Sequence, residues 1–202
     1  MELSTDSFLS ISGESRGLYR EKASKFIAVA LPVSTEEEAK TSLEALRNTY
    51  HDANHHCYAY RLGLENQSYR VNDDGEPSGS AGKPIYGQIL STGLSDILVV
   101  VIRYFGGTKL GIPGLIHAYR TAARTALDQA EIIEKIICVQ FRVTFEYPIM
   151  NEIMRIFKEE GIKIVNQTSA ENCEIDFQVR KSHVDKLQTR FSRLKNIRMV
   201  SL

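Results

Sequence analysis

The sequence lacks a long apolar run and an excess of charge of either sign. Its longest apolar run, ILVVVI at residues 97–102, is far shorter than the roughly 20 residues needed to cross a bilayer. The beginning, MELSTDSF, has no basic region followed by an apolar one, so we expect neither a membrane span nor a secretory signal. Because 25 basic residues balance 25 acidic ones, any nucleic-acid surface must be a local patch.

Cysteine is also scarce. Cys57, Cys138 and Cys173 are widely spaced and include no CxxC pair, which argues against a disulfide framework and a cysteine-based zinc site. We therefore expect a cytoplasmic protein with no metal and no cofactor. What is present, 43% apolar and 25% charged residues in a chain of 202, is typical of a packed globule of one or two domains.

The C-terminal third predicts an α+β unit. Apolar residues alternate where strands are expected and recur at helical spacing where helices are expected. The order β-α-β-β-α-β is the ferredoxin-like arrangement. The predicted elements are a strand at 134–147, a helix at 148–160 ended by Gly161, a hairpin of 162–169 and 173–180, a helix capped by Ser182 and Asp185, and a strand at 197–202.

The first 130 residues predict a second α+β unit. Ten of the 13 glycines lie between residues 63 and 114, so an unusual backbone shape is expected there. Together the patterns predict an α+β protein with domains 1–131 and 132–202. The predicted strands are 25–33, 57–63, 68–71 and 97–102, and the predicted helices run from a Ser34–Glu37 cap to about 48, from 84 to about 90, and from 113 to 130.

The stretch DDGEPSGSAGKP at residues 73–84 is the most unusual in composition. It is not a phosphate-binding P-loop, because Pro77 and Pro84 stand where glycine and serine or threonine are required. Its carboxylates also lack the spacing of an EF-hand. Two interpretations stay open: an anion-binding concavity of backbone N–H groups before a helix, or a loop whose glycines serve only its turns.

The stretch NHHCYAYR at residues 54–61 offers polar side chains at the start of a strand. His55 and Cys57 share one face, and His56 shares the other with Tyr58, so few ligands converge. A Cys57 nucleophile with a histidine base stays open. If Asp73, Asp74, Glu76 and Ser78 converge with His55 and His56, they would form a pocket for a phosphorylated small molecule.

The segment at residues 103–124 places basic and aromatic residues around a Gly-Gly turn. His117, Arg120 and Arg124 recur at i, i+3 and i+7 on the helix that follows. Basic groups beside aromatic rings suit phosphate backbones and stacked bases, whereas a solvated helix face is the alternative. The candidate nucleic-acid or phosphate-binding residues are Lys83, Arg103, Tyr104, Gly106, Gly107, Lys109, Arg120 and Arg124.

Several stretches together resemble the IMPACT family in its bacterial, YigZ-like form. They are SKF (24–26), ANHHCYAYR (53–61), DDGEPSGSAGKP (73–84), and VVVIRYFGGTKLG (99–111) followed by GLIHAYRTAA (114–123). The resemblance implies an N-terminal domain similar to a domain of a small-subunit ribosomal protein, arranged as an α/β sandwich, and a ferredoxin-like C-terminal domain. The same pair of domains occurs in elongation factor G. Eukaryotic relatives regulate translation by competing for the activator of an initiation-factor kinase. We expect that mechanism not to carry over, because this chain lacks room for their extra N-terminal interaction domain.

Three hypotheses follow. The first is a protein that binds RNA or the ribosome and regulates translation. The second is an enzyme or binder acting on a phosphorylated small molecule, although the sequence establishes no catalysis. The third is a regulator that binds a protein partner in translation control without nucleic acid. The sequence names neither the ligand nor the oligomeric state.

Overall fold

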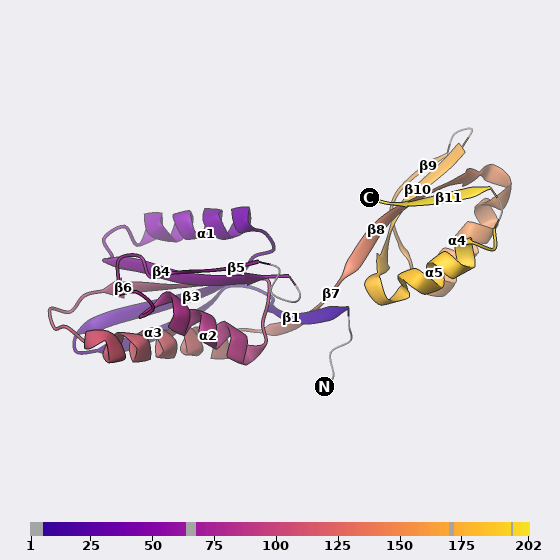
Figure 1. Cartoon of the computed structure of the whole chain (residues 1–202). Coiled ribbons are helices and arrows are strands. Elements are labelled where there is room, and N and C mark those ends of the chain that lie inside the picture. Colours follow the sequence, from indigo (N-terminus) through magenta and orange to yellow (C-terminus); the bar gives the residue numbers. More distant parts are fainter. Residues whose placement is uncertain (1–5, 64–67, 170–171, 195) are drawn as a thin grey trace. The chain divides into compact units, whose positions relative to one another are not determined.

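The computed structural model describes residues 6–63, 68–169, 172–194 and 196–202 (Figure 1). Contacts divide the chain into two units. One is Phe8–Lys135, and the other joins residues 136–202 to Asp6 and Ser7. Each unit contains both helices and strands, so the α+β fold expected from the sequence is confirmed.

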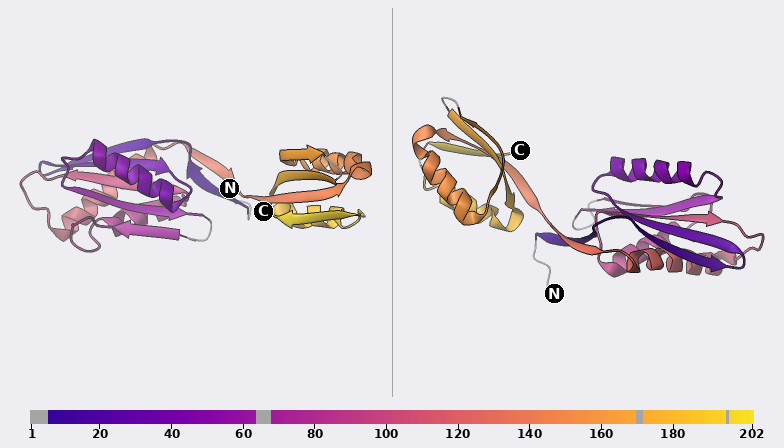
Figure 2. Two further views of the ribbon diagram at one scale, coloured as in Figure 1. Left: turned by 90° about the horizontal axis from the view of Figure 1, so that it is seen from above. Right: turned by 180° about the vertical axis from the view of Figure 1, so that it is seen from behind.

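The unit Phe8–Lys135 is a three-layer sandwich around an antiparallel sheet (Figures 1 and 2). The strand order is β2-β3-β6-β4-β5. Helix α1 covers one face of this sheet, and α2 and α3 lie side by side on the other. The elements are β1 (Ser7–Ile11), β2 (Ser15–Glu21), β3 (Ser24–Pro32), α1 (Glu36–Thr49), β4 (His55–Leu62), β5 (Ser68–Asn72), α2 (Gly82–Thr92), β6 (Ile97–Tyr104), α3 (Gly111–Asp128) and β7 (Ile132–Ile136).

Strand β6 explains the continuous apolar run of the sequence. Val99 and Val101 pack under α2 and α3, whereas Val100 and Ile102 pack under α1. A central strand buried on both faces needs apolar residues at every position rather than at alternate ones. Strand β4 pairs with β6 in register, and its Cys57 and Ala59 belong to the core under α2 and α3. His55 lies on the same side, because residues two apart on a strand share a face.

Strands β1 and β2 were not predicted, and one predicted cap was misplaced. The SFLSI and SRGLYRE segments of β1 and β2 mix polar and apolar residues, since they lie at edges. The start of α1 is capped by Thr35, whose Oγ1 accepts the Glu38 N–H, one residue beyond the predicted Ser34–Glu37 pair.

The second unit has the ferredoxin-like order predicted from the sequence. Its sheet order is β11-β8-β10-β9, and α4 and α5 cover one face (Figure 1). Phe141, Phe177 and Phe157 lie in its core. The elements are β8 (Cys138–Glu146), α4 (Met150–Glu160), β9 (Lys163–Ser169), β10 (Asn172–Arg180), α5 (Val184–Phe191) and β11 (Ile197–Ser201), with short 3-10 turns at Tyr147–Ile149 and Lys181–His183.

Two details of this unit differ from the prediction. The single strand expected at 134–147 is two strands, because β7 pairs with β1 whereas β8 pairs with β10 and β11. Ser182 does not cap α5: it lies in the 3-10 turn, and its hydroxyl donates to the Asp6 carboxylate. The predicted hairpin turn at residues 170–172 lies partly outside the described residues.

Candidate functional site

The carboxylate of Asp73 occupies the N-terminus of α2. Its two oxygens accept the backbone N–H groups of Gly79, Ala81 and Gly82 at 2.8, 2.9 and 2.8 Å. Burial alone would raise the pKa of Asp73, but these three donors outweigh it and lower the pKa. The N–H groups that could have formed a concavity for an external anion are therefore already bound by this side chain.

Asp74 holds together three parts of the sandwich. One carboxylate oxygen accepts the Arg47 guanidinium of α1 at 3.0 Å, and the other accepts the backbone N–H of His56 at 2.6 Å. The Asp74 carbonyl lies 2.7 Å from Nδ1 of His55. Burial lowers the pKa of His56, so its ring is neutral at pH 7. Arg47 was missed from the sequence, where nothing local marks it.

Glu76 and Arg103 form a buried ion pair at 2.6 Å, with 9% and 5% of these residues exposed. The Tyr119 hydroxyl donates to the same carboxylate oxygen at 2.8 Å and lies 3.2 Å from the Cys57 sulfur. Burial raises the pKa of both Cys57 and Tyr119, so the thiol stays protonated at pH 7 and the Cys57 nucleophile that the sequence left open gains no support.

Tyr119 could have been found from the sequence. It lies on the apolar side of α3 with Leu115, Ala118 and Ala122, opposite the basic side. A tyrosine on the buried side of a helix needs a hydrogen-bond partner for its hydroxyl, which indicates a polar group beneath the helix.

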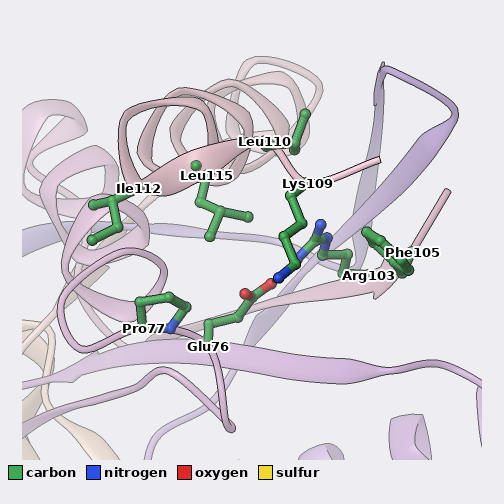
Figure 3. Close-up of a pocket in the computed structure, with 9 residues that line it drawn as sticks. Glu76, Pro77, Arg103, Phe105, Lys109, Leu110, Ile112 and Leu115 are labelled. Carbon is green, nitrogen blue, oxygen red and sulfur yellow. The ribbon is translucent and has the colours of Figure 1, made fainter. Parts of the chain in front are cut away.

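A cleft opens above this ion pair, between the loop at Glu76 and the start of α3 (Figure 3). We call it the Arg103 cleft. Its volume is about 390 Å³. Its lining residues are Glu76, Pro77, Arg103, Phe105, Lys109, Leu110, Gly111, Ile112 and Leu115.

The Gly-Gly turn is required by the backbone rather than by a ligand. A Cβ on Gly106 would lie 2.1 Å from the carbonyl carbon of Ala23, and the Gly106 N–H donates to the Ser24 hydroxyl at 3.1 Å. Gly107 has φ +82°, which favours glycine. The turn thus fixes the end of β6 at Tyr104 and the position of Lys109 before α3 begins at Gly111.

A second hollow, of about 570 Å³, lies between α2 and α3. We call it the Lys83–Arg120 groove. Neither Lys83 nor Arg120 has an ion-pair or hydrogen-bond partner among the described residues, and no acidic side chain lines the groove. Its lining residues are Gly79, Lys83, Pro84, Gly87, Gln88, Ile116 and Arg120.

The predicted site residues are therefore distributed over several places. Lys83 and Arg120 share the groove, while Arg103 and Lys109 share the cleft with Glu76. Tyr104 lies on the α1 side, where its hydroxyl donates to Asp52 at 2.8 Å, and it lines neither hollow.

The polar cluster expected around the histidines is divided in the same way. His55 Nε2 lies 3.9 Å from Glu76, but His56 faces the α1 side, and its ring lies 3.1 Å from the Tyr50 carbonyl. Ser78, also predicted for this cluster, is exposed. Arg124, from the predicted nucleic-acid-binding set, pairs with Asp128 at 2.7 Å. Within the described part of the chain, no three His, Cys, Asp or Glu side chains gather to hold a metal ion.

Comparison with known proteins agrees with this architecture. The Impact N-terminal domain matches residues 22–127, more than half of the 202 residues. The chain belongs to the IMPACT family. The matched region contains both hollows and every residue of the Glu76–Arg103–Tyr119 network.

Bacterial members of the IMPACT family are similar over most of their length. YvyE of Bacillus subtilis is 31% identical over 86% of this chain and 80% of that protein. YigZ of Escherichia coli is 35% identical over 72% of each. A solved structure described as a hypothetical protein is 27% identical, with a TM-score of 0.76 over 98% of both chains. No helix in the described residues is both long and apolar enough to span a membrane.

Proposed function

We propose that the protein binds RNA, free or within the ribosome, through the surface of α2 and α3, and that it acts in the regulation of translation. The observation that carries the proposal is the Lys83–Arg120 groove, in which two exposed cations have no ion-pair partner among the described residues and no acidic side chain lines the groove. Two neighbouring cations of this kind bind the phosphates of a nucleic-acid backbone, and such contacts do not depend on the base sequence.

The charge of the sandwich is divided between its faces. Helices α2 and α3, with the turn at 105–110, hold four basic residues, Lys83, Lys109, Arg120 and Arg124, and one acid, Asp128. Helix α1 on the other face holds four glutamates and two basic residues. A chain of zero net charge therefore still presents one positive face, which can attract a polyanion locally.

The set of residues in this proposal is smaller than the set expected from the sequence. Arg103 is not included, because it is buried and paired with Glu76. Tyr104 is not included, because it faces α1. The link to translation is supported by family membership, and the RNA contact is supported by the groove and the charge of the face.

The test is binding to single-stranded RNA and to ribosomes over a range of salt concentrations. We expect Lys83→Ala with Arg120→Ala to lower the slope of log K against log salt by about 1.4 for single-stranded RNA, because each lost phosphate contact contributes about 0.7. Co-sedimentation with ribosomes at low salt should fall in parallel.

The matched control is Lys40→Ala with Arg70→Ala. These two exposed residues line a hollow on the α1 side together with Glu36 and Glu37, so the control removes the same charge from the other face. If the control weakens binding as much as the groove variant, or if the intact protein retains neither RNA nor ribosomes at low salt, the proposal is wrong.

A further inference from the structure

We propose that the Arg103 cleft is a binding site for a small molecule with one anionic head, a carboxylate or a phosphate, and an apolar body. This proposal goes beyond RNA binding and does not rest on it, because the cleft and the Lys83–Arg120 groove share no lining residue. Its volume of about 390 Å³ lies within the range of small-ligand pockets, roughly 300–1,000 Å³.

The apolar residues that line the cleft favour a ligand with an apolar body. Pro77, Leu110 and Leu115 line it, and Figure 3 shows the Leu115 side chain projecting from α3 between the labelled residues. Phe105 and Ile112 remain 45% and 54% exposed, so large apolar side chains surround an open cleft in a soluble sandwich. Aliphatic walls of this kind favour a hydrocarbon body over a sugar-phosphate chain.

One end of the cleft is positively charged. The N-terminus of α3, an 18-residue helix, lines it through Gly111 and Ile112, has no side-chain cap, and has no acid in its first turn. Lys109 lies beside it, exposed, and pairs with no described residue. An uncapped helix N-terminus next to a lysine attracts a single oxyanion.

The floor of the cleft provides an independent observation. Arg103 is 5% exposed, and its guanidinium lies between the rings of Phe26 and Phe105, at 5.4 and 5.5 Å from their centroids. One nitrogen donates to Glu76, but Nε is buried and has no partner among the described residues. A guanidinium has five N–H donors, and in this one, which lines the cleft, Nη1 donates to Glu76 while Nη2 has no hydrogen-bond partner among the described residues.

The charges that line the cleft determine which sign of ligand charge it favours. Glu76 also lines the cleft, and its carboxylate offsets the charge of Arg103. Lys109 and the helix N-terminus are then left uncompensated, which favours an anion over a cation or a neutral molecule. The same Glu76 disfavours a ligand with more than one anionic head.

The experiment is a titration of the ¹⁵N-labelled full-length chain, monitored by backbone amide shifts. The probes are hexanoate and hexyl phosphate, which separate the two possible heads, with hexan-1-ol and acetate as controls lacking the charge or the body. We expect one or both hexyl anions to shift residues 105–112 saturably, with a dissociation constant on the order of 1 mM for so small a ligand. Hexan-1-ol and acetate should each bind about 10-fold more weakly, since each lacks one half of the recognition.

Two exposed positions test the site without endangering the fold. Lys109→Ala and Ile112→Ser should each weaken binding of the hexyl anion about 3-fold or more, the first by removing charge and the second by removing apolar surface. The matched controls are Lys40→Ala on α1 and Leu18→Ser on β2, where Leu18 is 48% exposed, and these should leave binding unchanged.

Three outcomes would overturn the proposal. They are equal binding of hexan-1-ol and the anions, shifts that map away from residues 103–115, and no saturable shift at concentrations about 10-fold above the expected constant. None of them bears on the groove, because RNA binding is measured separately with Lys83→Ala and Arg120→Ala.

Discussion

At the scale of single residues, the charged groups that stand out in the sequence mostly serve the protein itself. Asp73 binds the start of α2, Asp74 binds Arg47 and a backbone N–H, and Glu76 neutralises Arg103. Lys83, Lys109 and Arg120 have no such partner among the described residues, and for that reason we propose them as contacts for other molecules. The partner of a charged side chain therefore decides its role more than its place in a motif does.

Asp73→Asn should destabilise the protein by roughly 1–3 kcal/mol, because a charged acceptor of three backbone N–H groups is replaced by a weaker one that also carries donors. The free energy of unfolding should be measured in urea. The pH dependence gives a second measurement. The folded pKa of Asp73 is lowered, so its contribution is present above the unfolded value of about 3.9 and is lost as the pH falls through the folded pKa.

The variant should accordingly lose less stability than the native protein when the pH is lowered from about 5 towards 2. Asp185→Asn, at an exposed position of the first turn of α5, serves as the control with the same change of side chain. Equal acid sensitivity of native and Asp73→Asn proteins would show that the three donors do not stabilise the ionised carboxylate.

At the scale of elements, the close approach of α3 to β2 depends on one glycine. A Cβ on Gly17 would lie 2.5 Å from the backbone nitrogen of Ala126 and 2.9 Å from the carbonyl oxygen of Ala122. The helix presents alanines at this contact, so backbone lies directly on backbone. The position of α3 over the sheet, and with it the position of both hollows, follows from this contact.

Gly17→Ala should destabilise the protein by about 1–3 kcal/mol, the usual cost of overpacking, because the atoms it meets are backbone and cannot rotate away. Gly87→Ala is the matched control in α2, where the added Cβ meets nothing within 4 Å. This control should stabilise the protein by about 0.5–1 kcal/mol, since alanine favours a helix. Urea unfolding of both variants checks the prediction, and effects of the same sign would contradict it.

The elements were predictable to the extent that their burial is regular. The helices and the ferredoxin-like order followed from apolar periodicity, and Gly161 ends α4 as expected. Strand β2 was missed because an edge strand exposes alternate residues, and β1 was missed because its short SFLSI segment mixes serine with apolar residues. The site was less predictable, since the pairing of Glu76 with Arg103 joins residues 27 apart and only the packed sheet brings them together.

At the scale of the whole molecule, the two units are not two consecutive stretches of chain. The sequence predicted domains 1–131 and 132–202, whereas contacts assign Asp6 and Ser7 to the unit formed by residues 136–202. Asp6 is 1% exposed, and its carboxylate lies 3.2 Å from Nε of Arg180 and accepts the Ser182 backbone N–H at 3.2 Å. The beginning of the chain thus stabilises its last unit.

Asp6→Ala should destabilise the unit of residues 136–202 by about 1–3 kcal/mol, because the backbone N–H and hydroxyl of Ser182 lose their acceptor and the partly exposed Arg180 loses its partner. Hydrogen exchange should accelerate in β8, β10 and β11 and stay unchanged in the sheet of Phe8–Lys135. Asp185→Ala is the control within the same unit, at an exposed carboxylate. Acceleration in both units, or in neither, would contradict the assignment.

The Asp6 contact also has a consequence for how the protein is made. Asp6 is synthesised 176 residues before its partner Ser182. At a synthesis rate of about 5–20 residues per second, the Asp6 carboxylate has neither the Arg180 nor the Ser182 contact for roughly 9–35 s. Strand β1 likewise cannot pair until β7 has been synthesised. The unit of residues 136–202 therefore lacks its Asp6 contact until Ser182 has been synthesised, although Asp6 itself is made long before the rest of that unit.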